Sequence, residues 1–216
     1  MEDKNQKVFE DFSVPDPIRI KKAVDFIKSK FKNLNELSVL ELGMAKGGVA
    51  DSFKDSGARC FGIDVNPRQM KGVKIKQADL NLGIPDFGIK FNVVFAGEVM
   101  EHIFDDQRFL ENCRDVLMPG GYLIITVPNL FFLVNRFTMF FGKMPYFAYA
   151  TYHYHMYGKK ILSNMFSSNG FRVKKIISSH ILYSTRRNAA GKIFEALGNV
   201  FPSLGAHLII FGEKIN

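Results

Sequence analysis

Three acidic side chains lie in or just after three successive apolar segments, a spacing that suits hydrogen bonding to a polar ligand. Glu41 lies in the first segment, Asp64 comes 23 residues later behind the second, and Asp79 comes 15 residues after that behind the third. If these segments are parallel strands, their carboxyl ends meet at one edge of a sheet, where α/β proteins bind ligands. Three acids in this pattern are more specific than any one of them.

The two later acids predict recognition of a nucleoside. A carboxylate behind a strand, as Asp64 is, accepts hydrogen bonds from both ribose hydroxyls in dinucleotide-binding folds. Asp79 in turn is placed to accept from the exocyclic amine of adenine, with Leu80 and Val65 on either side of the ring.

The segment Val39–Gly48 predicts a buried strand, a glycine-rich turn and the start of a helix. Gly43 and Gly47 let the backbone come close to a ligand, and the methyl group of Ala45 between them narrows this approach without abolishing it. Glu41 sits badly beside a pyrophosphate, which needs bare backbone amides. An acid there suits a cofactor with a cationic amino-acid end, such as S-adenosylmethionine.

A second constellation, Gly97-Glu-Val-Met-Glu-His102, follows the apolar segment Phe91–Ala96. On a helical turn, Glu98, Glu101 and His102 fall at i, i+3 and i+4 and share one face. We assign Gly97 to the cofactor site. His102 is our main catalytic candidate, as a general base or as the group that positions the acceptor, with Glu101 beside it. A structural interpretation, with Glu101 capping and His102 packing, stays open.

Residues 38–128 resemble class I S-adenosylmethionine-dependent methyltransferases, in the group that carries a Gly-Glu-Val-x-Glu-His segment. The run Val116–Asn129 resembles the family's fifth-strand signature, and His153–Tyr157 and Phe201–Leu208 recur in related forms. The resemblance implies a Rossmann-like, doubly wound α/β sheet of seven strands, mostly parallel with an antiparallel last strand, and one bound S-adenosylmethionine.

The Glu-x-x-Glu-His pattern is similar to one that binds metal in ubiquinone-pathway O-methyltransferases and small-RNA 2′-O-methyltransferases. The resemblance implies that Glu98, Glu101 and His102, with His155 as a further ligand, hold a divalent cation such as Mg²⁺. Such an ion lowers the pKa of an acceptor hydroxyl. Catalysis by His102 without a metal is the alternative.

The elements that must position these residues alternate as strands and helices, which predicts parallel βαβ units. We expect a single methyltransferase domain over residues 1–216. It divides into an N-terminal helical segment (1–37), a cofactor-binding core (38–128), an aromatic acceptor-site insertion (129–170) and closing strands (171–216). Two strands, Phe171–Ser178 and His207–Gly212, are expected in the last part.

The segment Leu130–Phe141 predicts a helix with more apolar surface than a small helix usually buries. Three interpretations stay open: a lid over the acceptor site, a surface that touches a membrane, and a helix buried in the core. Tyr146–Tyr157 then adds six aromatic residues and two histidines, which suit stacking on a flat ring or packing in the core.

The net charge of +8 is unevenly distributed: +1 over residues 1–37, −2 over 38–128 and +9 over 129–216. Of the 29 aromatic residues, 17 lie in the last part. This composition favours an anionic or aromatic partner. Cys60 and Cys113 are expected to be buried thiols, and with neither a signal peptide nor a membrane-spanning segment in evidence we expect a cytoplasmic protein.

The sequence therefore predicts methyl transfer from S-adenosylmethionine to an oxygen of a small or lipid-like acceptor, with peripheral membrane contact as a further possibility. An RNA ribose methyltransferase, which would use the metal pattern and the basic last part, is one alternative. A non-catalytic binding or assembly protein that retains the cofactor fold is another. Glu41 and the antiparallel last strand disfavour a dehydrogenase. The oligomeric state stays open.

Overall fold

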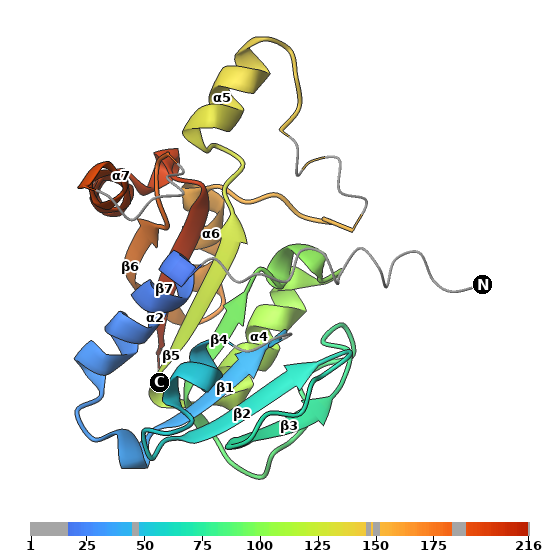
Figure 1. Ribbon diagram of the computed structural model, residues 1–216. Helices are drawn as coiled ribbons and strands as arrows, with labels where there is room; N and C mark the ends of the chain where they lie inside the picture. The colour runs from blue at the N-terminus through green and yellow to red at the C-terminus, as the bar shows by residue number, and fades with distance from the viewer. Residues whose placement is uncertain (1–16, 45–47, 146–147, 149–151, 183–188, 216) are drawn as a thin grey trace.

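A computed structural model describes residues 17–44, 48–145, 148, 152–182 and 189–215, the side chains of 189 and 190 excepted. One seven-stranded sheet forms its centre, in the order β3-β2-β1-β4-β5-β7-β6 (Figure 1). The strands are β1 (Ser38–Leu42), β2 (Arg59–Asp64), β3 (Val73–Gln77), β4 (Phe91–Gly97), β5 (Leu117–Pro128), β6 (Phe171–Ser178) and β7 (His207–Lys214). All pairs are parallel except β5–β7 and β6–β7, which confirms the expected closing strand.

Helices cover both faces of the sheet (Figure 1). The helices of the described part of the chain are α2 (Pro17–Lys30), α3 (Val49–Phe53), α4 (Asp106–Val116), α5 (Leu133–Phe140), α6 (Lys159–Ser168) and α7 (Ala189–Val200), with short 3₁₀ helices η1 (Leu34–Glu36), η2 (Met100–His102) and η4 (Pro202–Leu204). Of these, α5 projects beyond the end of the sheet and covers neither face (Figure 1). The buried residues of α2 and α3 share one hydrophobic core with the sheet, and those of α4 and α6 share a second core on the other face.

The strands at the centre of the sheet are apolar because helices bury them from both sides. All five residues of β1 are buried, and β4 is buried except at Asn92 and Gly97. Strand order reverses between β1 and β4, which is the switch point where such sheets leave a crevice for a ligand. Both chemistry-bearing segments of the sequence, which follow β1 and β4, therefore end at this switch point.

Two elements differ from the sequence-based expectation. The helix expected over residues 130–141 begins only at Leu133, since Phe132 has an extended conformation with φ −50° and ψ 142°. The sequence pattern predicts a strand over Tyr122–Val127, but strand β5 begins at Leu117, and its ladder to β4 jumps from Leu117 to Tyr122. The intervening Pro-Gly-Gly turn is therefore a bulge in the strand. Among the described residues, no helix combines the length and the apolar character needed to cross a bilayer.

Candidate active site

The acids at the ends of β2 and β3 lie side by side, as expected. The Asp64 carbonyl accepts a hydrogen bond from the Ala78 amide at 3.1 Å, which fixes the two strand ends together. The Asp64 carboxylate accepts from the Asn66 amide at 2.9 Å, and that of Asp79 accepts from the Asn81 amide at 2.9 Å. These bonds to the following turns orient both carboxylates at the carboxyl edge of the sheet.

The two apolar residues assigned to the adenine ring differ in exposure. Val65 is 61% exposed behind β2, whereas Leu80 is 7% exposed and belongs to the core. An exposed Val65 leaves a surface on which a flat ring can pack. The binding of adenine between these residues stays a prediction.

The glycine turn after β1 is described at its ends only. Gly43 has φ +67°, and a Cβ there would collide with the Val99 side chain, so the turn needs glycine at this position. Its amide donates to the Ile63 carbonyl at 2.8 Å and joins the turn to β2. Ala45 and Gly47, which we also assigned to the cofactor, lie outside the described residues.

Glu41 serves the helix that follows the turn. Its carboxylate, 4% exposed, accepts hydrogen bonds from the amides of Val49 at 3.2 Å and Ala50 at 2.8 Å. A carboxylate at these amides caps the first turn of α3. Burial raises the pKa of Glu41 to about 7, although the two amide bonds act in the opposite direction. The predicted role around the methionine end stays a prediction.

Glu98 belongs to an ion-pair network that no sequence pattern indicates. Its Oε1 lies 2.7 Å from Arg19 Nη1 and accepts a hydrogen bond from Thr126 Oγ1 at 3.0 Å, and its Oε2 lies 3.6 Å from His207 Nε2. Burial alone would raise the pKa of Glu98, but Arg19, His207 and Thr126 hold it below the ordinary value. Glu98 is therefore a carboxylate.

The backbone at Glu98 explains its direction. Its φ is +55°, in the left-handed region that few residues other than glycine adopt. Helix η2 begins two residues later at Met100, so Glu98 lies outside the turn that carries Glu101 and His102. The expectation of one shared helical face was wrong for Glu98. Arg19 had no local signal, because α2 reaches the site only through the tertiary fold.

Glu101 is the most unusual group of the site. It is 2% exposed, and neither carboxylate oxygen has a hydrogen-bond partner among the described residues. Burial raises the pKa of Glu101 well above its ordinary value, and the negative charge of Glu98 raises it further. A buried carboxyl group left in this state calls for a proton or a cation.

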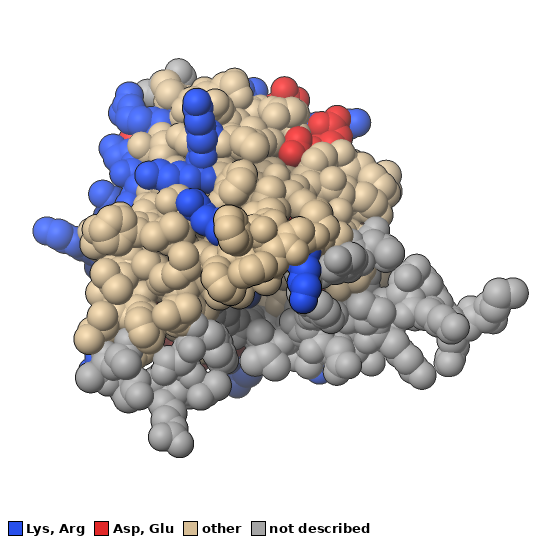
Figure 2. All heavy atoms as spheres, turned by 90° about the horizontal axis from the view of Figure 1, so that it is seen from above, with Lys and Arg blue, Asp and Glu red and all other residues tan. Residues whose placement is uncertain are grey.

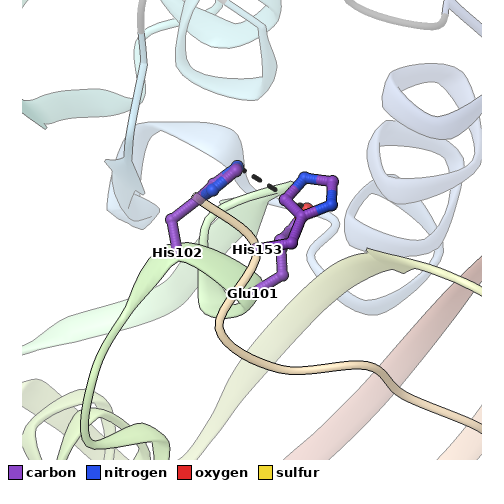
Figure 3. A group of neighbouring side chains, drawn as sticks. All are labelled: Glu101, His102 and His153. Carbon is purple, nitrogen blue, oxygen red and sulfur yellow. Dashed lines mark ion pairs between the residues drawn. The ribbon is translucent and has the colours of Figure 1, made fainter. Parts of the chain in front are cut away.

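Two imidazoles lie beside this carboxyl group (Figure 3). Ligand atoms of Glu101, His102 and His153 all lie within 4.8 Å of one another, with Glu101 and His102 on η2 and His153 on a segment that crosses it. His102 Nε2 is 4.0 Å from Glu101 Oε1. One carboxylate and two imidazoles form a donor set that divalent metals use.

The orientation of His102 follows from its backbone contact. His102 Nδ1 lies 3.0 Å from the Tyr152 carbonyl, which only accepts, so Nδ1 carries the hydrogen and Nε2 keeps its lone pair. Burial lowers the pKa of His102, while the bond to Tyr152 acts in the opposite direction. The imidazole is therefore neutral near pH 7, the form needed of a base or a metal ligand.

The structure brings His153, and not His155, next to Glu101 and His102. His155 Nδ1 lies 3.6 Å from the Asp106 carboxylate and its Nε2 is 3.2 Å from the Phe104 carbonyl. The two histidines are two residues apart, and in an extended segment such residues point to the same side. The sequence therefore offered no means of choosing between them.

The strand order and the antiparallel β7 define the fold of S-adenosylmethionine-dependent methyltransferases. One such enzyme from Mesorhizobium loti has a TM-score of 0.62 over 90% of this chain and 100% of that one, at 12% identity. Magnesium protoporphyrin IX methyltransferase from Synechocystis, with bound S-adenosylhomocysteine, also gives 0.62, over 92% of this chain and 83% of that one, at 12% identity.

Residues 17–176 match a family model described as a methyltransferase domain, and the chain belongs to this family. It is 30% identical over 129 residues to a ubiquinone biosynthesis O-methyltransferase from Bradyrhizobium sp. (strain ORS 278), a match that covers 52% of this chain and 51% of that one. The matched part thus spans about half the length of this relative. The resemblance drawn from the sequence motifs is confirmed.

Proposed function

We propose that this protein transfers the methyl group of S-adenosylmethionine to an oxygen of a small or lipid-like acceptor. The acceptor oxygen lies at Glu101, His102 and His153 in this proposal. The observation that carries it is the buried carboxyl group of Glu101, without a hydrogen-bond partner among the described residues and within 4.8 Å of both imidazoles.

The cofactor side of the proposal rests on the ends of β1, β2 and β3. When bound, S-adenosylmethionine supplies an electrophilic methyl group on a sulfonium centre. The Asp64 and Asp79 carboxylates hold the adenosine end, and Gly43 permits close approach of the chain. Methyl transfer is a direct displacement, so alignment of the two reactants and exclusion of water supply most of the rate.

The cluster of Glu101, His102 and His153 fits a divalent cation. A bound cation would lower the pKa of an acceptor hydroxyl and favour the attacking oxyanion. Glu101, His102 and His153 would hold it, and with two imidazole nitrogens this donor set suits Zn²⁺ or another transition metal better than Mg²⁺, which prefers oxygen. Glu98 lies in the network with Arg19 and balances charge at the site.

Without a cation, the same residues act as a proton-accepting pair. The neutral imidazole of His102, fixed by the Tyr152 carbonyl, takes the acceptor proton at Nε2. The Glu101 carboxyl group 4.0 Å away then faces the imidazolium that forms. In both versions the acceptor oxygen lies next to His102.

An aromatic acceptor fits the rings that border this site. Phe104 and Tyr154 are 64% and 48% exposed, and their ring centroids lie 4.3 Å apart. Tyr152 stands beside His102, with ring centroids 5.3 Å apart. The relative named above acts in ubiquinone biosynthesis as an O-methyltransferase, which supports a ring hydroxyl as acceptor.

The test begins with calorimetric titration of S-adenosylhomocysteine into the protein. Failure to bind at millimolar concentration would overturn the enzyme proposal in favour of a binding protein. Labelled S-adenosylmethionine is then incubated with phenolic quinone precursors, lipid fractions and RNA, each with and without chelator. We expect methyl transfer to the phenolic or lipid acceptors. The chelator should abolish this activity, and added Zn²⁺ or Mn²⁺ should restore it. Unchanged turnover in chelator would exclude a catalytic metal and leave His102 as the base.

RNA ribose methylation is the second candidate, and the charge of residues 129–216 favours it. This part holds 11 basic and 2 acidic side chains. Transfer of label to RNA, with binding that weakens steeply as salt rises, would select this candidate over the first.

A further inference from the structure

Helix α5 is attached to the protein by its polar side. Its one buried residue is Asn135, whose Nδ2 donates to the carbonyls of Asn129 at 3.0 Å and Leu130 at 3.3 Å. Amphipathic helices of globular proteins normally direct their apolar face to the core. Here the polar residue anchors the helix, and Figure 1 shows the helix projecting from the carboxyl end of the sheet.

The outward side of α5 is apolar. At about 100° per residue, its exposed apolar residues fall within about 120° of the helix circumference. Phe137, Phe140 and Phe141 are 66%, 82% and 61% exposed, and Leu133 and Val134 are 38% and 44% exposed. The Phe137 and Phe141 rings lie edge to face at 5.0 Å. Helices that lie in a membrane interface show such a face.

Helix α7 and the residue after it also expose apolar side chains. Ile193, Val200 and Phe201 are 57%, 67% and 50% exposed, while Gly198 on the opposite side packs on the backbone of His180. The two apolar surfaces are joined through η4, because Arg136 of α5 donates to the Ser203 carbonyl at 3.2 Å. They form one end of the molecule.

Basic side chains border these apolar residues. A cavity of about 510 Å³ beside the base of α5 is lined by Phe131, Ser203 and the exposed Lys159 and Lys160. Seen from above (Figure 2), this end is mostly uncharged, with Lys and Arg projecting around and through it, while most visible acidic atoms gather at one edge. Cations around an apolar projection match the layers of an anionic bilayer.

We propose that α5, the exposed side of α7, and Lys159 with Lys160 form a docking surface for an anionic lipid bilayer. Phe137 and Phe140 of α5, with Phe141 directly after it, enter below the headgroups, and the lysines bind lipid phosphates. The surface is independent of the methyl-transfer proposal, and it would bring a lipid-like acceptor to the same end of the sheet. A second copy of the chain fits less well, because a symmetric contact would bring the same cations together.

Vesicle co-sedimentation of the full chain tests this proposal. We expect binding to vesicles of phosphatidylcholine and phosphatidylglycerol in equal parts, and about tenfold weaker binding to phosphatidylcholine alone. The double variants Phe137→Ser/Phe140→Ser and Lys159→Glu/Lys160→Glu should each lose tenfold or more on the anionic vesicles. Circular dichroism checks that both are folded.

Matched controls change the same chemistry outside the surface. Leu82→Ser removes a side chain that is 83% exposed in the turn after β3, and Lys71→Glu/Lys74→Glu reverses two exposed charges at the β3 edge. We expect both to bind as the unaltered protein does. Equal losses in test and control variants would overturn the proposal. If the protein does not bind vesicles, two other results would also overturn the proposal. One is a dimer that Phe137→Ser/Phe140→Ser abolishes, and the other is RNA binding that only Lys159→Glu/Lys160→Glu abolishes.

Discussion

Arg19 of α2 and Glu98 at the end of β4 form an ion pair with 2.7 Å between Nη1 and Oε1. The same guanidinium donates to Thr126 Oγ1 at 2.9 Å, so one side chain connects the first described helix to two adjacent strands of the sheet. Arg19 and Glu98 are 12% and 23% exposed at their side chains. When a charge pair is so little exposed, removal of one partner leaves the other charge without compensation and destabilises the fold.

Removal of one charge of the pair should therefore lower the free energy of unfolding more than removal of both charges. We expect Arg19→Met to lower the free energy of unfolding by about 3 kcal/mol, because Glu98, which is little exposed, stays ionised without its cationic partner. Adding Glu98→Gln to this variant should recover part of the loss. Urea unfolding of the two single variants and the double variant measures the coupling, and strictly additive losses would contradict it.

Glu41 should make stability depend on pH. Its pKa in the folded protein is about 7, above the unfolded value near 4.5, so the folded state binds the proton more tightly. Its contribution is fully present below about pH 4.5 and is lost as the pH rises to about 7.

Glu41→Gln removes this dependence. The unfolding free energy of the unaltered protein minus that of the variant should fall by about 3 kcal/mol between pH 4.5 and 7.5. Because other groups titrate equally in both proteins, the difference isolates Glu41. A difference that stays constant with pH would show that Glu41 is not perturbed.

The two histidines of the crossing segment offer a matched pair for the metal proposal. We expect His153→Ala to weaken binding of Zn²⁺ by about tenfold or more, because it removes one of three ligands. His155→Ala should leave metal affinity unchanged, since His155 contacts Asp106 and the Phe104 carbonyl. Titration calorimetry measures both, and a larger effect at His155 would reverse our assignment.

Asp64→Asn should weaken binding of S-adenosylhomocysteine by about tenfold to a hundredfold, as expected for a lost hydrogen bond to a charged group. Asp86→Asn is a suitable control. The Asp86 carboxylate accepts from an amide two residues later, as that of Asp64 does, but in an exposed turn between β3 and β4. Equal affinities of the two variants would exclude Asp64 from the cofactor site.

Tyr157 fixes the segment that carries His153. It is 2% exposed, and its hydroxyl donates to the Asp106 carboxylate at 2.9 Å. We expect Tyr157→Phe to lower the unfolding free energy by about 2 kcal/mol, because the partly buried carboxylate of Asp106 loses a donor. Tyr154→Phe, at a half-exposed ring, should change it by less than about 0.5 kcal/mol. Thermal or urea unfolding distinguishes the two.

Patterns within single elements predicted much of the fold. The apolar runs around Glu41 and before Gly97 predicted the central strands β1 and β4, because residues buried on both faces of a sheet are apolar without alternation. Asp64 and Asp79 were placed at neighbouring strand ends for the same reason. The antiparallel β7 came from the family resemblance and from its position after β6.

The direction of side chains at the site was less predictable. A helical turn over residues 98–102 would have put Glu98 beside His102, but φ of Glu98 is +55° and its carboxylate turns to Arg19. The chain separation of these partners leaves no periodicity from which the contact can be read. Likewise the choice of His153 depends on Tyr154 donating to the Glu101 carbonyl at 2.8 Å.

The sequence by itself determined the family, the sheet and the glycine turn, because strand patterns, turn residues and motif spacing act over a few residues each. Only the tertiary structure decided that Glu41 caps α3, that Glu98 pairs with Arg19, and that α5 presents its phenylalanines outward. These depend on which distant groups meet across the fold, where burial and charge settle the partner of each side chain.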